Sequence, residues 1–557
     1  MTMAESPSFA ALLRQCRLAA GLTQEELAER AGLSVDGIGN LERGRRHPYR
    51  HTLVQLADAL ALTGDERARF EAAGHAAPRE RGDSHVLQAG REAGRRHDWA
   101  AAFSSLRRAA EHGELDAEDL ELLGEAAWAT GHYAECFRAR ERAYAAYCTA
   151  GNHPAAAAVA VMIATDYLVR LETAVGLGWY QSARRILQGE PECPAHGMLA
   201  WMDAQAAMRL AGDLDAALMH SQEAMELGGR LGDPNVQMLG LAIQGLVLIR
   251  QGAIGEGLAL TDEAMAVAVS GRLSLWAASQ VYCHTLSVCQ DIADFRRGLE
   301  WTETARRCHD NGRILPSSGH CRIHKAGLLR LHGDWTEAEE EARGGCDEVR
   351  DMDRHHIGMA MEEIGAIRLR KGDLQGAEEA FGYAHELGWS AQPGLALLRL
   401  AQGKPDAALT SIGNALAGDR LERLARHTLR AAQVEIALAA GNLEVARAAL
   451  AEMTEIAQAF GTAALEAARA AAAGAVLLAA GESMAALTEL QRAVRLWQEV
   501  DAPYEVARAR VLLAEAYRAQ LDSDSAALEL RAARSTFQRL GALPDVCRVA
   551  ELERSIP

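Results

Sequence analysis

The residues best suited to metal chemistry form one short cluster in the middle of the chain. Cys308 and His309 are followed by His320, Cys321 and His324. Thiolates and imidazoles are ligands that zinc prefers, and Cys321 and His324 lie three residues apart, on one face of a predicted helix. The spacing matches no zinc motif, and cysteines are common in helical cores. The candidate metal ligands are therefore Cys308, His309, Cys321 and His324, with ordinary packing as the alternative, and no cofactor is predicted.

Other catalytic signatures are missing from the sequence. The one Gly-Lys pair, Gly403-Lys404, is followed by Pro405, and Leu398 stands where a phosphate-binding loop needs its first glycine. The sequence contains no nucleophile elbow, no His-Glu-x-x-His and no paired Cys-x-x-Cys. We therefore expect that the protein is not an enzyme.

Arginines that could contact nucleic acid gather close to the N-terminus. The whole chain has 58 Lys and Arg against 76 Asp and Glu, a net charge of −18, which is not typical of a nucleic-acid binder. Residues 43–51, however, contain no acidic residue and the arginines Arg43, Arg45, Arg46 and Arg50. Because phosphate contacts supply most of the non-specific affinity for DNA, this local cluster matters more than the average charge.

Helix-capping residues divide residues 8–73 into five predicted helices. The segment Thr23-Gln-Glu-Glu26 forms a capping box, Gly32 can end a helix in the left-handed conformation, and Ser34 can cap the next helix. A helix, a tight glycine turn and a second helix present that second helix to the major groove of DNA. The capping pattern therefore predicts a DNA-binding domain.

These motifs resemble the Cro/C1-type (XRE) helix-turn-helix family of transcriptional regulators. The resemblance covers residues 9–73 and depends on Leu22-Thr-Gln-Glu-Glu-Leu-Ala-Glu-Arg-Ala-Gly-Leu-Ser34 and Leu41-Glu-Arg-Gly44. It implies a DNA-binding domain, which we place at residues 1–74. It also implies phosphate contacts from Gln24 and Ser34, base contacts from Val35, Asp36 and Asn40, and DNA-backbone contacts from Arg43, Arg45, Arg46 and Arg50. Unlike the usual pattern, the predicted recognition helix contains Gly37 and Gly39, each of which costs about 1 kcal/mol relative to alanine.

Pairs of helices recur through the rest of the chain. Residues 75–89 have linker composition, and residues 90–557 form about twelve units. A small residue stands five positions after each turn, and alanine usually stands twelve positions after it, with Glu190, Met453 and Arg534 as exceptions. Small residues seven apart on one helix allow a neighbouring helix to approach closely. The predicted turns are at His97, Gly131, Gly178, Gly212, Gly252, Ala293, Gly333, Gly372, Gly403, Gly441, Gly481 and Asp522.

This pattern resembles tetratricopeptide repeats, although the units are longer than the usual 34 residues. The resemblance implies an all-α protein in which the small N-terminal domain precedes an α-solenoid wound as a right-handed superhelix. The spacing of the turns further suggests an insertion before Gly178 and a truncated unit before Gly403. Aromatic and polar residues in the middle units could line a concave ligand groove or simply pack in the core; they are Trp276, Tyr282, His284, Trp301 and Trp335.

The two modules together predict a DNA-binding transcriptional regulator whose array senses a peptide, a small molecule or a partner protein. The alternative is an interaction scaffold with a weak or vestigial DNA-binding domain. Expected partners are double-stranded operator DNA, a ligand in the superhelix and a second copy of the chain. The sequence shows no secretory signal, no apolar run of membrane-spanning length and no disulfide framework, so we expect a cytoplasmic protein without membrane contacts.

Overall fold

The computed structural model describes residues 9–43, 48, 50–75, 81–112, 115–310, 319–350, 353–418 and 422–555. Within these ranges the ordered elements are helices and no strand is present, which confirms the predicted all-α fold class. The chain divides into two compact units, residues 1–90 with 108–113 and residues 91–107 with 114–557. None of the described helices is both long and apolar enough to cross a membrane.

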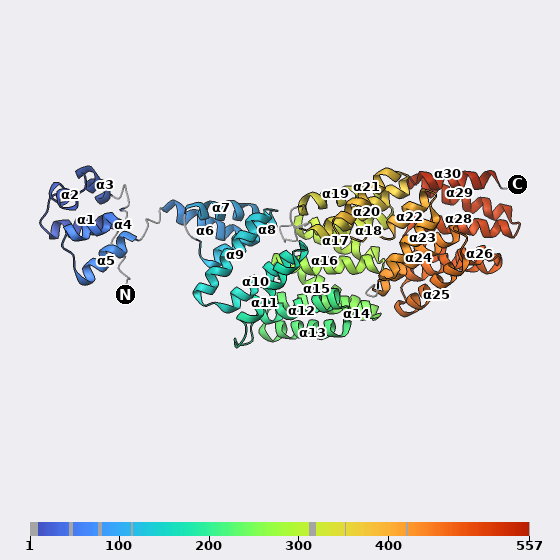
Figure 1. Cartoon of the computed structure of the whole chain (residues 1–557), viewed down its shortest axis with the longest axis horizontal. Coiled ribbons are helices and arrows are strands. Elements are labelled where there is room, and N and C mark those ends of the chain that lie inside the picture. The colour runs from blue at the N-terminus through green and yellow to red at the C-terminus, as the bar shows by residue number, and fades with distance from the viewer. Residues whose placement is uncertain are drawn as a thin grey trace. The chain divides into compact units, whose positions relative to one another are not determined.

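The first unit contains five short helices, as the capping residues predict. They are α1 (Phe9–Ala19), α2 (Gln24–Ala31), α3 (Val35–Glu42), α4 (Arg50–Ala59) and α5 (Gly64–His75) (Figure 1). Their apolar faces meet in one core, at the centre of which Leu13, Leu27, Ile38, Leu56 and Phe70 are fully buried. Such a core lets helices of 8 to 12 residues persist, although isolated helices of that length are only marginally stable.

A capping box begins α2, and two further local interactions form the turn between α2 and α3. Thr23 Oγ1 accepts a hydrogen bond from the Glu26 amide at 3.1 Å, and the Thr23 amide donates to Glu26 Oε2 at 2.7 Å. Gly32 ends α2 with a φ of 67°, and Ser34 Oγ accepts from the Gly37 amide at 3.0 Å. The predicted capping box and caps are therefore confirmed.

The helices from α6 onward form an array of pairs that lies mostly in the second unit, and the boundary between the two units falls inside α6 and α7. The first half of the array comprises α6 (Arg81–Arg95), α7 (Trp99–His112), α8 (Ala117–Ala129), α9 (Tyr133–Ala150), α10 (His153–Val169), α11 (Thr173–Ile186), α12 (Pro194–Ala206), the π-helical turn η1 (Ala207–Ala211), α13 (Leu214–Leu231), α14 (Pro234–Gln251), α15 (Ile254–Val269), α16 (Leu275–Asp291) and α17 (Phe295–Asp310). The second half comprises α18 (Gly319–His332), α19 (Trp335–Val349), α20 (Arg354–Lys371), α21 (Leu374–Glu386), α22 (Gly394–Ala401), α23 (Pro405–Leu416), α24 (Arg423–Ala439), α25 (Leu443–Phe460), α26 (Ala463–Ala479), α27 (Ser483–Glu499), α28 (Pro503–Ala519), α29 (Ser523–Leu540) and α30 (Leu543–Arg554).

Helix α6 begins at Arg81, inside the segment 75–89 where the sequence predicts a linker. The polar composition of this segment conceals a helical pattern, because Val86, Gly90 and Ala93 recur at the spacing of one helix face. Linker composition therefore does not exclude a helix in this segment.

Two of the predicted turns are shifted. Gly178 lies inside α11, and the turn before that helix is at Leu171, whose φ is 62°. The last turn is at Leu521, with a φ of 63°, one residue before Asp522, which caps α29. The sequence signal was glycine, whereas leucine occupies both left-handed positions at a cost of about 1 kcal/mol. Leu171 stands 40 residues after Gly131 and 41 before Gly212, so the expected insertion is absent.

The corrected turns make the small-residue pattern more regular. Five and twelve positions after Leu171 stand Gly176 and Ala183, and the corresponding residues after Leu521 are Ala526 and Ala533. All four are buried, and Glu190 and Arg534 cease to be exceptions, so only Met453 is large at position twelve. The small residues serve close contact between helix backbones: a Cβ at Gly257 would lie only 2.5 Å from the carbonyl oxygen of Gly245 on the paired helix.

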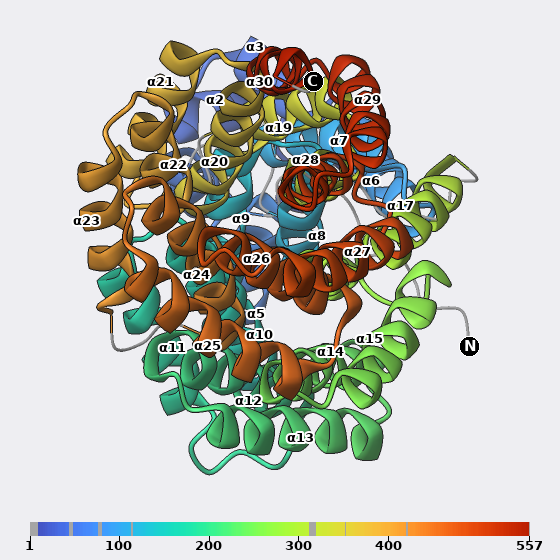
Figure 2. The ribbon, with the colours of Figure 1, turned by 90° about the vertical axis from the view of Figure 1, so that its right-hand side faces the viewer.

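The array winds far enough for distant units to meet. Figure 2 shows the paired helices arranged around a common centre. Helix α8 packs on α16, α18 on α28 and α20 on α30. Ion pairs also join units far apart in sequence, with Arg250 Nη1 2.5 Å from Glu422 Oε1 and His332 Nε2 3.2 Å from Asp501 Oδ2. The first helix of each pair consequently faces an enclosed interior. Helix α22 has only 8 residues, in line with the truncated unit expected before Gly403.

We predict that Leu521→Gly stabilises the array by about 0.5–1 kcal/mol. The side chain of Leu521 is 92% exposed, so its removal relieves the left-handed strain and loses little packing. The free energy of unfolding in urea measures the gain. The matched change is Gly481→Ala, at a turn with a φ of 81° and no atom near the new Cβ, which should lower that free energy by about 1 kcal/mol. Two changes of the same sign would contradict the strain argument.

Candidate DNA-binding face and ligand cavity

Helix α3 carries the predicted base-contacting residues on a solvent-facing side. Ser34 is exposed, Val35 is 42% exposed, and Asn40 is half-buried. Arg43 follows the helix, and its Nη2 donates to Asn40 Oδ1 at 3.2 Å. Arg45 and Arg46 lie outside the described residues. The same holds for the side chains of Asp36 and Arg50, whose backbones belong to α3 and α4.

Gly37 and Gly39 do not interrupt α3, which is helical from Val35 to Glu42. Gly39 is buried beneath the side chain of Arg43. A Cβ at this position would lie 3.1 Å from Arg43 Nη2. The glycine thus leaves room for the guanidinium to lie against the helix and reach Asn40. Gly39 weakens the helix but allows this contact between Arg43 and Asn40, which the sequence alone does not indicate.

An ion pair and an amide hold the three helices of this motif together. Arg17 Nε on α1 donates to Glu42 Oε1 at the end of α3 at 2.6 Å, and Arg17 Nη1 donates to the Leu22 carbonyl at 2.7 Å. Gln24 Nε2, at the start of α2, donates to Glu42 Oε2 at 2.6 Å. The predicted phosphate ligand Gln24 is therefore already bound to Glu42 through one amide proton.

The network depends on a charged and buried carboxylate. The side chain of Glu42 is only 4% exposed. Burial by itself would raise the pKa of Glu42, but hydrogen bonds from Arg17 and Gln24 and the charges of Arg17 and Arg14 outweigh it and lower the pKa below its ordinary value. Sequence analysis missed Arg17 and Glu42, because a pair 25 residues apart leaves no local signal.

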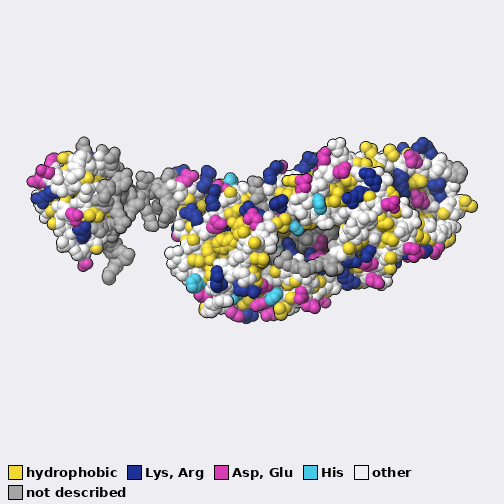
Figure 3. All heavy atoms as spheres, viewed as in Figure 1, with side chains coloured by type: hydrophobic (Ala, Val, Ile, Leu, Met, Phe, Trp, Pro, Cys, Tyr) yellow, Lys and Arg dark blue, Asp and Glu magenta, His cyan; other side chains and the backbone are white. Residues whose placement is uncertain are grey.

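The second unit encloses a cavity of about 1520 Å³. The residues that line it come mainly from the first helices of the pairs, from α10 through α28. The space-filling view shows the array hollowed near its middle, with basic and acidic side chains visible inside (Figure 3). Ligand sites are usually concave and apolar with a few placed polar groups. This cavity is larger than most such sites and carries many more charges.

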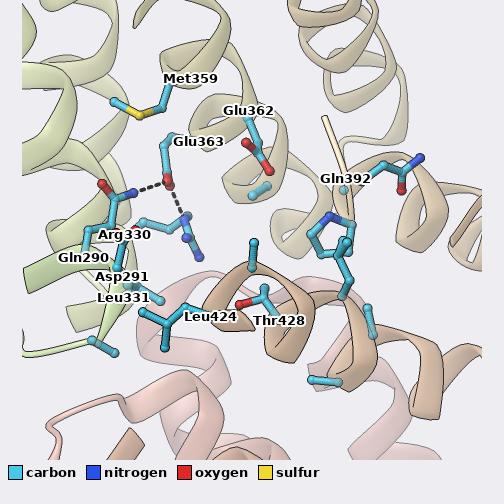
Figure 4. Close-up of a pocket in the computed structure, with 18 of the residues that line it drawn as sticks. Gln290, Asp291, Arg330, Leu331, Met359, Glu362, Glu363, Gln392, Leu424 and Thr428 are labelled. Carbon is cyan, nitrogen blue, oxygen red and sulfur yellow. Dashed lines mark hydrogen bonds and ion pairs between the residues drawn. The ribbon is translucent and has the colours of Figure 1, made fainter. Parts of the chain in front are cut away.

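Two neighbouring carboxylates on α20 differ in their environment, as Figure 4 shows. Glu363 accepts hydrogen bonds from Arg330 and from Gln290 Nε2, the latter at 3.0 Å. Glu362 accepts from Trp389 Nε1 at 2.6 Å and has no cationic partner among the described residues. Burial raises the pKa of Glu362 to about 8, so this side chain is largely protonated at neutral pH and can donate a hydrogen bond into the cavity.

Several polar atoms on the cavity wall have no hydrogen-bond partner within the described part of the chain. They are Arg250 Nε, His284 Nδ1, Gln392 Oε1 and His427 Nε2. His284 is 4% exposed and His427 2% exposed, so bulk water does not reach them freely. An unsatisfied buried group costs about 1–3 kcal/mol, and a ligand or ordered water that bonds these atoms removes that cost.

The predicted groove residues lie partly at this cavity. Trp276 and His284 line it. Tyr282 instead donates to Thr302 Oγ1 at 3.0 Å, Trp301 Nε1 donates to Asp262 Oδ1 at 2.8 Å, and Trp335 packs edge-on against Tyr504. Helical spacing groups residues of one helix, but only the winding of the array decides which helix face turns inward. That is why sequence analysis missed Glu362, Glu363 and His427.

Two of the predicted metal ligands contact other residues in the structure. Cys321 is hydrogen-bonded to Cys283, and His324 Nδ1 lies 3.3 Å from Gln290 Oε1. Cys308 is half-buried near the end of α17. The side chain of His309, and residues 311–318 that connect α17 to α18, lie outside the described residues.

We predict that Glu42→Ala lowers the stability of the first unit by about 2 kcal/mol, because it leaves the nearly buried guanidinium of Arg17 without its charged acceptor. Hydrogen exchange of residues 9–42 in the full-length protein measures the loss. The control is Glu29→Ala on the exposed side of α2, which should change exchange little. Equal exchange in the two variants would show that the network contributes no stability.

We further predict that the array loses stability between pH 7 and pH 5. Burial lowers the pKa of His427 to about 4, below the 6.5 of the unfolded chain. A histidine with a lowered folded-state pKa stabilises the fold above pH 6.5, and that contribution is lost as the pH falls toward 4. The loss at pH 5 is about 2 kcal/mol for His427.

Urea unfolding at both pH values should show a smaller difference in the free energy of unfolding for His427→Gln than for the wild type. His220→Gln, at a partly exposed position, should leave the difference unchanged, and a full-size difference in His427→Gln would refute the assignment.

Comparison with known proteins shows what the N-terminal residues are similar to. A helix-turn-helix domain model matches residues 8–70. The chain is 46% identical over 56 residues to the uncharacterized HTH-type transcriptional regulator y4dJ of Sinorhizobium fredii, covering 10% of this chain and 68% of the relative. It is 39% identical over 56 residues to the uncharacterized HTH-type transcriptional regulator YazB of Bacillus subtilis, covering 10% of this chain and 81% of that protein.

Solved structures similar to parts of the chain include Cut9–Hcn1 of the APC/C, with a TM-score of 0.35, 13% identity and coverage of 84% of this chain and 96% of that chain. Another is a tetratricopeptide repeat protein from Parabacteroides merdae, with a TM-score of 0.30, 15% identity and coverage of 46% and 93%. A third is the apo quorum sensor NprR from B. thuringiensis, with a TM-score of 0.34, 12% identity and coverage of 68% and 97%. By its matching N-terminal residues, the chain belongs to the family of helix-turn-helix transcriptional regulators.

Proposed function

We propose that the protein binds operator DNA through its first unit and senses a ligand in the cavity of its helical array. The observation on which the proposal depends is the solvent-facing side of α3, which carries Ser34, Val35 and Asn40 and ends at Arg43. In this proposal residues 1–74 form the DNA-binding domain, residues 75–89 connect it, and residues 90–557 form the sensor.

The chemistry of α3 suits the major groove. The side-chain amide of Asn40 can bond adenine in a bidentate manner, and the methyl groups of Val35 can contact thymine. Gln24 and Ser34 stand at the N-terminal ends of α2 and α3, where free amides and the helix dipole favour phosphate. We propose phosphate contacts from these two residues, a base contact from Asp36, and contacts of Arg43, Arg45, Arg46 and Arg50 with the DNA backbone. A dimer on two half-sites would double this interface.

The cavity supports the sensing half of the proposal. Its wall offers unpartnered donors and acceptors together with the protonated Glu362, and it is enclosed by units that meet across the array. A peptide or a small polar molecule that bonds these atoms would favour the wound conformation over any more open one, because a ligand shifts an equilibrium by its differential affinity for the two states.

We predict that the full-length protein binds its own upstream DNA region with strong salt dependence. Fluorescence anisotropy measures the dissociation constant at several salt concentrations. The double change Arg45→Ala/Arg46→Ala should weaken binding and lower the slope of log K against log salt by about 2, because each lost phosphate contact removes about 0.9.

The control for this test is Arg69→Ala on the exposed side of α5, which removes one positive charge away from α3, against two in the double variant, and should leave the slope unchanged. A control effect half as large as that of the double variant would show that the arginines act only through net charge. Absent or salt-independent binding by the wild type would overturn the DNA-binding proposal and favour the interaction scaffold.

A further inference from the structure

A carboxylate and two imidazoles converge on the wall of the cavity. Asp353 Oδ2 lies 2.9 Å from His320 Nε2 and 2.7 Å from His356 Nδ1. One nitrogen of each histidine and one oxygen of Asp353 all lie within 4.8 Å of one another. Asp353 is completely buried and His320 is 9% exposed, so these groups are shielded from bulk water. All three residues line the cavity.

The repeat architecture brings these residues together. His320 lies in the first turn of α18, and His356 lies in the first turn of α20. Because α18 and α20 are the inner helices of successive units and pack against each other, equivalent positions meet at one level of the wall. Asp353 is anchored as the N-cap of α20, since its Oδ1 accepts from the His356 amide at 2.9 Å. Its other oxygen, Oδ2, is left to face the two imidazoles.

We propose that His320, Asp353 and His356 bind a divalent transition-metal ion, for which zinc is the natural probe. Two imidazoles and a carboxylate are ligands that zinc uses, and a site with three protein ligands leaves a fourth position for water or a cavity ligand. The site differs from the cysteine-containing set expected from the sequence. It depends only on the second unit and is independent of the proposed DNA binding.

The observed distances are compatible with a metal after a small adjustment. Ligand atoms about 2.1 Å from a tetrahedral ion are about 3.4 Å apart. The two contacts of Asp353 Oδ2, at 2.9 and 2.7 Å, are hydrogen bonds and need to widen by roughly half an ångström. Neighbouring groups support the ligands. The ring of His324 lies edge-on to that of His356 with centroids 5.6 Å apart, and His324 itself contacts Gln290.

Titration calorimetry of the full-length, chelator-treated protein with zinc sulfate tests the proposal. We expect one zinc ion per chain, and elemental analysis of the dialysed complex should give the same ratio. His356→Gln should weaken zinc binding about 100-fold. The matched control is His427→Gln on α24, because His427 is another buried histidine of the cavity wall and is not part of the three-residue group; it should bind zinc as the wild type does.

A second measurement needs no variant and so does not depend on how well one folds. Zinc should slow hydrogen exchange of the wild-type protein at residues 319–324 and 353–357 and not at the beginning of other helices. Cobalt(II) bound at the same site should show the visible absorption of a tetrahedral complex. Absence of stoichiometric zinc, equal weakening by the His427 variant, or protection confined to other segments would each overturn the proposal.

Discussion

Close contact between helix backbones is the constraint on which the array depends. It requires alanine, glycine or cysteine five positions after each turn, and at Gly257 the neighbouring carbonyl of Gly245 leaves no room even for a methyl group. Closely packed pairs stack with a small rotation between units, as in other helical repeats. The rotation accumulates until α18 meets α28 and α20 meets α30, so the inner helices enclose a cavity instead of lining an open groove.

Enclosure gives polar residues of the inner helices unusual properties. Ion pairs such as Arg250–Glu422 and Arg370–Glu505 join units distant in sequence, and the second pair is separated by 3.1 Å. Removed from bulk water, His284 and His427 have lowered pKa values, and Glu362 has a raised one. Each buried polar atom without a hydrogen-bond partner lowers the stability of the fold by about 1–3 kcal/mol. The array tolerates a few such atoms because its apolar core is extensive. The same atoms form a ready set of contacts for a bound molecule.

The first unit is smaller, and its stability depends on other interactions. Its recognition helix contains two glycines, which together cost about 2 kcal/mol of helix stability. Charge-assisted hydrogen bonds from Arg17 to Glu42 offset this cost at the end of that helix, by the roughly 2 kcal/mol expected to be lost in Glu42→Ala. Gln24 completes the clamp, so the relative placement of α2 and α3 is set by buried polar contacts as well as by the core around Ile38. The outward side of α3 is thereby free to vary for recognition.

The sequence by itself determined the features that depend on neighbouring residues: the helices, the caps at Thr23 and Ser34, most turns of the array and the small-residue positions. These follow from local geometry, because a cap or a turn is completed within a few residues. The turn at Leu171 was missed because a leucine, and not a glycine, occupies the left-handed position there. Only the tertiary structure decided that His320 would meet Asp353 and His356, that Arg17 would meet Glu42, and that Glu362 would face an enclosed interior. Those encounters depend on how helices far apart in the chain pack and wind, and no local pattern records that geometry.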